Sequence, residues 1–359
     1  MPLNLAVIAG DGIGPEVTHA ALEVLDATGL ATQRESFPFS AAHYLETGAV
    51  LTDEDVESLR RFDAILLGAV GGAPNDPRLA GGVIEKGILL KLRFDLDQYV
   101  NFRPVKLYPG IDTPLAGRGP GDIDFVCIRE NTEGLYAGMG GASRVGTPQE
   151  VSTQTMLTTA FGVERCVRYA FGVAAARERK HLTLVHKTNV LTHAGATWKR
   201  VFDEVAAEFP GVSTGYHHVD ACCMHMVANP GQYDVLVVPN MFGDIITDLG
   251  AAIAGGMGIA ASGNLNPDGT GPSMFEPVHG SAPDIAGQNL ANPIAAIDSL
   301  GLLLRETGRI KNDDDAVRAG DRVGEAVRAV TPDFAGKGLD RSGYGTDEVT
   351  RMVIDALRG

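Results

Sequence analysis

Two aspartates four residues apart carry the strongest chemical signal in the sequence. Asp244 and Asp248 lie in NMFGDIITDLG, where a helix would project both side chains from one face. Two carboxylates on one face repel each other unless a cation sits between them, and such hard oxygen ligands suit Mg²⁺ or Mn²⁺. A solvated helix face is the alternative, but the flanking residues are apolar. We therefore predict a metal site, with Asp220 after a predicted strand as a candidate third ligand.

Three arginines from separate segments could bind a carboxylate substrate. Arg93, Arg103 and Arg129 each carry a guanidinium fork that can hold a carboxylate through two hydrogen bonds. The chain has a formal net charge of -15, which disfavours nucleic acid and anionic membranes and would also repel an acidic substrate. Converging arginines would overcome that repulsion. Taken singly, each could equally be a surface ion pair.

Two loops and one lysine complete the candidates. The turn GDGIG at 10–14 follows an apolar run, but Pro15 stands where a dinucleotide-binding G-x-G-x-x-G pattern needs glycine, so a tight strand-to-helix turn is the simpler interpretation. The segment 276–293 is rich in turn residues and could present backbone groups to a flat ligand, with Asp284 accepting the hydroxyls of a ribose. Lys187 follows an apolar strand and would be a base if it faced a substrate, otherwise a surface residue.

The elements that must position these residues alternate along the chain. Apolar runs predict strands over 3–9, 64–70, 124–130, 182–187, 213–220 and 233–239, and helical spacing predicts helices over 15–27, 84–98, 157–177, 244–256 and 289–305. This alternation predicts an α/β fold. The four cysteines form no C-x-x-C pair, and the N-terminus does not resemble a signal peptide, so we expect a reduced, cytoplasmic protein.

Taken together, the motifs resemble those of the β-decarboxylating dehydrogenases, the isocitrate/isopropylmalate dehydrogenase family. LRFDLDQYVNFRP, IRENTEGLY, HKTNVL, NMFGDIITDL and EPVHGSAPDIAG occur in the family's order. The resemblance implies an isopropylmalate dehydrogenase-like fold of two α/β domains around a cleft, not a Rossmann fold. The first, cofactor-binding domain would comprise 1–98 plus 258–359, and the second would comprise 99–257. It also implies a homodimer with shared active sites, and the small-sided apolar segment 249–260 suggests where subunits could pack closely.

The resemblance assigns roles to individual residues. Arg93, Arg103 and Arg129 would bind the malate part of the substrate, and Tyr136 would protonate the carbon left after loss of CO₂. Lys187, as general base, and Asp220 would serve the neighbouring subunit's site, with Asp244 and Asp248 completing the metal ligands. The cofactor NAD would contact the following residues: Ile13, Asn189, His279, Gly280, Ser281, Ala282, Asp284 and Asn292. No cation follows Asp284 in PDIAGQNL to meet a 2′-phosphate, which favours NAD over NADP.

The segment IEKGILLKLR bears on the choice of substrate. Ile88, Leu89 and Leu90 offer an apolar wall ahead of Arg93, which suits an isopropyl group. We therefore expect a (2R)-malate-type substrate, with 3-isopropylmalate first. Its product would be 4-methyl-2-oxopentanoate, a step of leucine biosynthesis. A D-malate or tartrate dehydrogenase, or a related alkylmalate or homoisocitrate enzyme, stays open because DQYVNFRPV, NLNP and IRENTEGLY resemble those enzymes. A non-catalytic regulatory subunit is a remote alternative, since no metal or base residue is missing.

Overall fold

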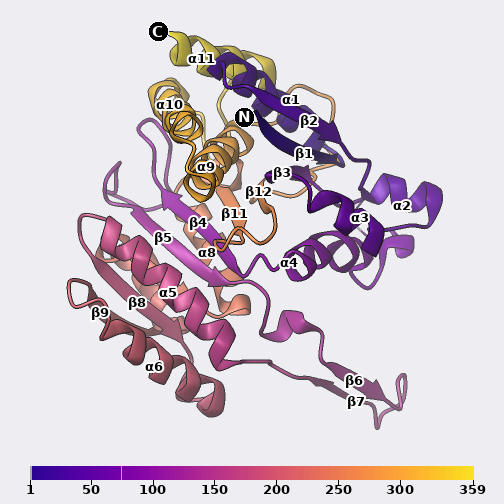
Figure 1. Cartoon of the computed structure of the whole chain (residues 1–359), viewed down its shortest axis with the longest axis vertical. Helices are drawn as coiled ribbons and strands as arrows, with labels where there is room; N and C mark the ends of the chain where they lie inside the picture. The colour runs from indigo at the N-terminus through magenta and orange to yellow at the C-terminus, as the bar shows by residue number, and fades with distance from the viewer. Residues whose placement is uncertain (1, 74) are drawn as a thin grey trace.

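A single ten-stranded sheet runs through the molecule (Figure 1). The computed structural model describes residues 2–73 and 75–359. The strand order is β2-β1-β3-β12-β11-β4-β5-β10-β8-β9. Pairing is parallel toward both ends, whereas β12–β11, β11–β4 and β4–β5 are antiparallel.

The sheet divides into two halves by origin in the chain. The terminal half comes from both ends of the sequence: β1 (Leu3–Gly10), β2 (Thr32–Ser36), β3 (Ala64–Ala69), β11 (Ala261–Leu265) and β12 (Ser273–Pro277). The central half comes from the middle: β4 (Val100–Lys106), β5 (Asp124–Glu130), β8 (His181–His186), β9 (Ser213–His218) and β10 (Val235–Val238). The two halves join where β11 pairs with β4.

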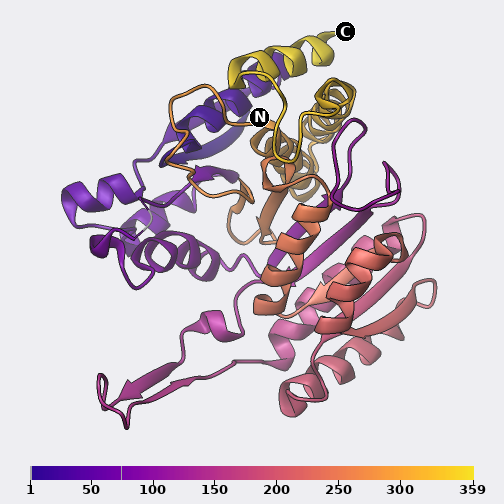
Figure 2. The same ribbon diagram turned by 180° about the vertical axis from the view of Figure 1, so that it is seen from behind.

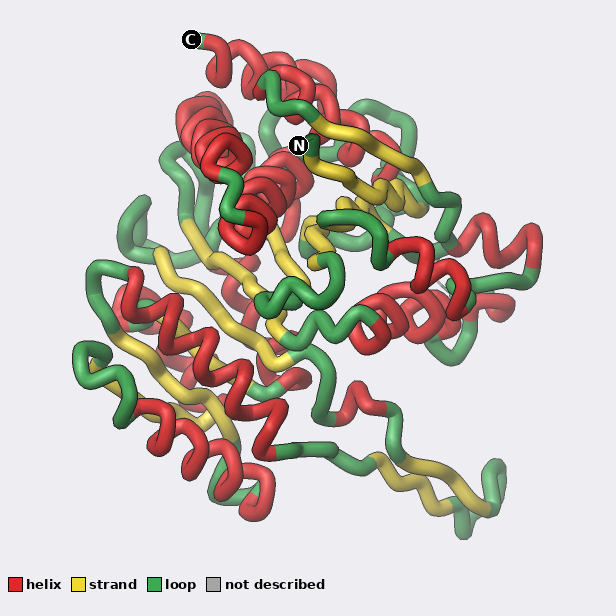
Figure 3. The backbone as a smooth tube through the Cα atoms, viewed as in Figure 1, coloured by secondary structure: helices red, strands yellow, loops and turns green. Residues whose placement is uncertain are grey.

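Helices cover both faces of the sheet, so that the molecule has three layers (Figure 3). One face is covered by α1 (Gly14–Thr28), α5 (Ala160–Ala176), α6 (Thr192–Ala206), α9 (Ile294–Lys311), α10 (Asp314–Val330) and α11 (Thr346–Arg358), whose apolar side chains form one continuous core. The other face carries two smaller cores. One lies under α2 (Ala41–Thr47), α3 (Asp53–Leu59) and α4 (Lys91–Asp95), and the other lies under α7 (Val219–Ala228) and α8 (Asn240–Ile253).

Strand alternation explains these cores. On β5, Val126 and Ile128 point into the large core, whereas Phe125 and Cys127 point into the core under α7 and α8. Arg129 continues the second set, so it points to the face that carries the two smaller cores. The functional side chains described below therefore gather on that face.

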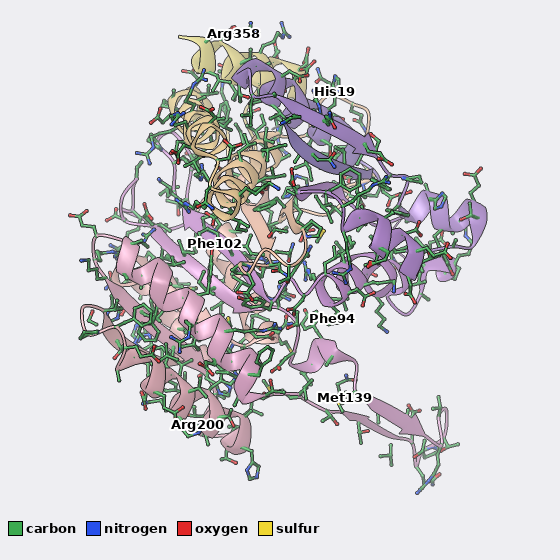
Figure 4. All side chains as sticks on the ribbon, viewed as in Figure 1. His19, Phe94, Phe102, Met139, Arg200 and Arg358 are labelled. Carbon is green, nitrogen blue, oxygen red and sulfur yellow. The ribbon has the colours of Figure 1, made fainter. Side chains whose placement is uncertain are left out.

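A two-stranded arm projects away from the body of the molecule (Figures 1 and 2). It consists of β6 (Gly140–Ser143) and β7 (Val151–Gln154), paired antiparallel, and all eight residues are exposed. In Figure 4, Met139 marks the base of this arm and Phe102 marks β4 in the middle of the sheet. The sequence did not predict the arm, because its residues are mostly small and polar.

The predicted strands and helices are present, with shifted ends. The helix expected over 84–98 begins as a π-helical turn, Glu85–Leu90, and continues as α4. The helices expected over 157–177, 244–256 and 289–305 are α5, α8 and α9. The segment 249–260 differs from expectation, because most of its residues are buried within the chain and only Ala252 and Met257 are exposed. Among the described residues, no helix combines the length and apolar character needed to cross a membrane.

Candidate active site

The three arginines converge on one cavity of about 280 Å³ between the two smaller cores. Arg93 comes from α4, Arg103 from β4 and Arg129 from β5, and all three side chains are buried. Tyr136, in the short helical turn Leu135–Ala137, also lines the cavity, as does Asp244 of α8. Four of these residues come from positions 93–136 and Asp244 from much later in the sequence, and the fold brings all five to one cavity.

Arg129 is the most deeply buried of the three. Its Nε and Nη2 donate to the side-chain oxygen of Asn240, at 3.0 and 2.8 Å, and its Nη1 donates to Asp244. Burial, followed by the neighbouring cation of Arg103, lowers the pKa of Arg129 to about 10. The guanidinium carbon lies 5.2 Å from the centre of the Tyr136 ring. At neutral pH the group therefore remains a cation and faces the cavity.

The other two arginines are held by different partners. Arg93 Nη2 lies 3.0 Å from Oε1 of Glu276, a buried acid on β12 that also accepts from Asn264. Arg103 Nη1 donates to Thr247 Oγ1 at 2.7 Å. The Nε atoms of Arg93 and Arg103 have no hydrogen-bond partner among the described residues. Both arginines line the cavity, where their cations attract carboxylates.

Asp244 and Asp248 share one face of α8, as predicted, but they do not lack a neighbouring cation. Asp244 contacts Arg129, and Arg103 lies 3.7 Å from Asp244 and 3.8 Å from Asp248. Burial opposes the charge of Asp244, yet Arg129, the hydroxyl of Tyr136 and Arg103 together hold its pKa below the ordinary value. Burial raises the pKa of Asp248, and Asp244 adds to that rise against the opposing effect of Arg103. Repulsion between the two carboxylates is therefore a weaker reason to expect a metal ion. Their position on one face, where both offer oxygen ligands, remains a reason to expect one.

Tyr136 is oriented by the same aspartate. Its hydroxyl donates to Asp244 Oδ2 at 2.6 Å. Burial, together with this hydrogen bond and the charge of Asp244, raises the pKa of Tyr136 above its ordinary value. The phenol is therefore protonated at neutral pH and can supply a proton at the cavity wall.

Lys187 and Asp220 lie apart from this cavity and form a pair of their own. Lys187 Nζ is 2.7 Å from Asp220 Oδ1, which holds the pKa of Asp220 below its ordinary value. Neither residue lines the arginine cavity. Within the described part of the chain, no three His, Cys, Asp or Glu side chains come together as a metal site. One chain thus brings Asp244 and Asp248 together but leaves Asp220 elsewhere.

The candidate cofactor residues form a second region that adjoins the arginine cavity. The turn at Gly10–Gly14 packs against the loop after β12, because the backbone N–H of Ile13 donates to the carbonyl of Ser281 at 2.8 Å. A side chain on Gly12 would place Cβ 1.9 Å from that same carbonyl, and Gly12 has a φ of 58°. The two loops therefore form one surface, and His279 and Gly280 continue it to the cavity wall.

Two polar atoms on this surface lack partners. His279 Nε2 and Asn292 Nδ2 are buried and make no hydrogen bond within the described residues. Burial lowers the pKa of His279, so its ring is neutral at pH 7. Ala282 adopts a φ of 35°, and Asp284 is exposed. Asn189, which the resemblance also assigned to the cofactor, lies exposed near Lys187 instead.

Two of the three residues predicted to form an apolar wall line the cavity. Leu89 and Leu90 line the cavity together with Val70. Ile88 does not line it, because it packs with Leu92 into the core under α3. Residues four apart on a helix share a face, so Ile88 follows Leu92 inward while Leu89 follows Arg93 toward the cavity.

Four residues that hold the site together were missed from the sequence: Glu276, Asn240, Thr247 and Asp11. The first three orient the arginines. The carboxylate of Asp11 accepts from the backbone N–H groups of Ala41, Ala42 and Gly71 at 2.7 to 3.0 Å, and so ties the first turn to the N-terminus of α2 and to the loop after β3. Of the four, Glu276 and Asn240 had a signal in their position, since Glu276 opens the predicted loop and Asn240 opens the acidic helix.

Comparison with known proteins places this geometry in a family. The family model "Isocitrate/isopropylmalate dehydrogenase" matches residues 4–353. A 3-isopropylmalate dehydrogenase of Clavibacter michiganensis is 55% identical over 99% of this chain and 98% of its own length, and one of Mycobacterium tuberculosis is 56% identical over 99% and 100%. The crystal structure of isocitrate dehydrogenase from Methylococcus capsulatus superposes with a TM-score of 0.87 at 34% identity, covering 99% of this chain and 100% of that one. These full-length matches confirm the predicted fold, and the chain belongs to the isocitrate/isopropylmalate dehydrogenase family.

Proposed function

We propose that this protein is a 3-isopropylmalate dehydrogenase, which oxidises and decarboxylates 3-isopropylmalate to 4-methyl-2-oxopentanoate in leucine biosynthesis. The observation that carries the proposal is one cavity that combines three buried arginines with an apolar wall of Leu89 and Leu90. The arginines suit the carboxylates of a malate unit, and the leucines suit a branched alkyl group. The end-to-end similarity to proteins named 3-isopropylmalate dehydrogenase supports the same substrate.

The binding of a divalent metal ion by Asp244, Asp248 and the partner subunit's Asp220 is part of the proposal. The shared face of Asp244 and Asp248 offers carboxylate oxygens of the kind that Mg²⁺ and Mn²⁺ bind. When bound, such an ion supplies Lewis-acid chemistry to the hydroxyl and carboxylate oxygens of the substrate. The ion completes its protein ligands only if a second subunit contributes, since Asp220 lies elsewhere in the same chain.

A homodimer with shared active sites follows from this arrangement. Exposed apolar side chains gather on the two helices that carry the acidic ligands, with Met224 and Val227 on α7 and Ile245 on α8. Monomers seldom leave large apolar side chains clustered at the surface without a partner. We assign this surface, rather than the segment 249–260, to the subunit interface. The partner subunit's Lys187 would then face the substrate held by this chain.

NAD⁺, which accepts the hydride, is assigned to the surface formed by the Gly10–Gly14 turn and the loop after β12. The partnerless Nε2 of His279 and Nδ2 of Asn292 fit a ligand with many polar atoms. Asp284 is assigned to the ribose hydroxyls, and the absence of Lys and Arg from PDIAGQNL favours NAD over NADP. The exposed position of Asn189 suits a role at the partner subunit's site, as for Lys187.

The residues of the chain divide the chemistry between them. Arg93, Arg103 and Arg129 hold the substrate carboxylates and orient C2 and C3. Lys187 takes the proton of the 2-hydroxyl as general base. Tyr136, kept protonated by burial and by Asp244, returns a proton to the carbon from which CO₂ leaves.

The two halves of the sheet are proposed to be the two domains of the protein, 1–98 plus 258–359 and 99–257. The arginine cavity lies across their junction, with Arg93 on one side and Arg103 and Arg129 on the other. Relative movement of the halves would open and close the cavity around the substrate.

A substrate panel tests the function. Purified protein with NAD⁺ and Mn²⁺ is assayed for NADH formation with 3-isopropylmalate, D-malate, tartrate, isocitrate and homoisocitrate. We expect the highest kcat/KM with 3-isopropylmalate. A higher value with D-malate or tartrate would reassign the enzyme to those substrates, and turnover of none of the five would remove the proposal.

A further inference from the structure

We propose that Asn240 is a positioning residue that orients the guanidinium of Arg129 for the substrate carboxylate without neutralising its charge. Asn240 begins α8 and is 1% exposed. Its side-chain oxygen accepts from both Nε and Nη2 of Arg129, and its side-chain nitrogen donates to the carbonyl of Glu133 at 3.1 Å. The amide therefore has only one useful orientation, with its oxygen toward the arginine.

The remaining donors of Arg129 are left for a ligand. A guanidinium has five N–H groups. Asn240 takes two and Asp244 takes one, so one N–H on each terminal nitrogen is free. Two such N–H groups on the outer edge of a guanidinium match the two oxygens of a carboxylate.

The first turn of α8 also fixes the stem of this arginine. A Cβ added to Gly243 would lie 2.6 to 3.0 Å from the Cβ, Cγ and Cδ atoms of Arg129. The helix therefore packs directly against the aliphatic part of the side chain while Asn240 holds its head. With stem and head both fixed, the free edge of the guanidinium has a single direction.

The neutrality of Asn240 is the feature that matters for binding. A carboxylate at this position would accept the same two hydrogen bonds but would pair with the cation, and it would face the carbonyl of Glu133 with no donor. Arg129 already contacts one acid, Asp244. A second acid would cancel the attraction that the substrate carboxylate needs, whereas an amide leaves it in place.

The test is a double-mutant cycle on substrate binding, and it rests on the proposed function. The dissociation constant of 3-isopropylmalate is measured by titration calorimetry with Mn²⁺ and without NAD⁺, for the wild type, Asn240→Ala, Arg129→Lys and the double variant. Hydrogen bonds to a charged group contribute strongly to binding free energy. In the background that keeps Arg129, we therefore expect Asn240→Ala to weaken binding roughly ten- to a hundredfold. A lysine side chain has no guanidinium fork to orient, so in the Arg129→Lys background the same change should cost less than about threefold.

Two further variants separate positioning from folding. Asn240→Asp keeps the size of the side chain and should weaken binding at least as much as Asn240→Ala, while leaving the KM for NAD⁺ near the wild-type value. Gln33→Ala, exposed on the edge strand β2 far from the cavity, is the control and should leave binding unchanged. If Asn240→Ala does not fold, as judged by thermal unfolding, Asn240→Ser replaces it in the cycle.

The inference is overturned if the Asn240 change weakens binding by the same factor in both backgrounds, or if Asn240→Asp binds 3-isopropylmalate as tightly as the wild type. Failure of the proposed function looks different. In that case the wild type itself would prefer another malate, and the same cycle run with that substrate would still test Asn240, because every malate carries the carboxylate.

Discussion

The side-group wall gives the sharpest quantitative prediction. Leu89 and Leu90 line the arginine cavity, and a malate held by its carboxylates would direct its C3 substituent toward them. Burying an isopropyl group gains roughly 0.8 kcal/mol per carbon, or about 2 kcal/mol for three carbons. That free energy corresponds to roughly thirtyfold in kcat/KM over unsubstituted D-malate. We therefore expect a preference for 3-isopropylmalate of at least about tenfold.

Changing either leucine to serine should narrow this preference. Leu89 and Leu90 are half-buried, so each change should remove only part of the gain, about 1 kcal/mol or roughly fivefold in the ratio. The assay is the initial rate of NADH formation with both substrates, NAD⁺ and Mn²⁺, for the wild type, Leu89→Ser and Leu90→Ser. D-malate turnover should change little, because its contacts are to the arginines.

Ile88 provides a matched control from the same helical segment. Ile88 is 1% exposed and lies in the core, so Ile88→Val should cost about 1 kcal/mol of stability without changing the substrate ratio. The prediction is contradicted if the ratio of kcat/KM for 3-isopropylmalate to that for D-malate stays unchanged in both leucine variants, or if it shifts in Ile88→Val. Either result would show that the two leucines do not select the C3 substituent.

Four other predictions follow from the site and its surroundings. The kcat/KM with NAD⁺ should exceed that with NADP⁺, and a preference for NADP⁺ would contradict the assignment of the loop after β12. EDTA should abolish turnover, and added Mn²⁺ should restore it. The Asp244→Asn variant should lose most of its activity even with Mn²⁺ present. Full turnover in EDTA would contradict the requirement for a metal ion. Mixing inactive Lys187→Met chains with inactive Arg129→Ala chains should restore some activity, because one of the two sites in each heterodimer carries neither change. If heterodimers are shown to form and no activity returns, the sites are not shared between subunits. Burial, with a smaller contribution from a neighbouring histidine, lowers the pKa of His186 to about 4. Between about pH 6.5 and pH 4, this histidine therefore binds a proton in the unfolded chain but not in the folded chain. Stability should therefore fall between about pH 6.5 and 4 by up to about 3 kcal/mol, and denaturant titrations of His186→Leu should lack that part of the fall.

The parts of the fold that the sequence predicts well are those with one dominant physical signal. β3 and β10 are buried along their whole lengths and read as apolar runs. β11 and β12 were missed although they are equally buried, because their buried residues are partly polar. Asn264 and Glu276 satisfy each other across these strands, and Asn101 donates to Asn264 from β4. A polar network that closes only in three dimensions has no local pattern.

The residues of the site likewise fall into a predictable group and an unpredictable group. The arginines, Tyr136 and the acidic pair were named from residue type and motif order, but their neighbours were not predictable. Arg129 and Asn240 are 111 positions apart, and Arg93 and Glu276 are 183 apart. The direction of Ile88 also depended on the fold, because the phase of a helix is set by which side chains meet the core. The separation of Lys187 and Asp220 from the cavity was implied only by the resemblance.

The insertion of β12 between β3 and β11 has a consequence for synthesis on the ribosome. β1, β2 and β3 emerge first, yet the edge of β3 that β12 covers stays open until residues 273–277 have been made. All six residues of β3 are buried in the finished molecule, so during most of translation an apolar strand has one edge of unpaired backbone N–H and C=O groups. The central half waits too, because β10 enters between β5 and β8 only at residues 235–238, but it is one contiguous stretch and is complete before β12 is made. Nascent chains should therefore complete the central half before the terminal half, whose first three strands wait for the last quarter of the chain.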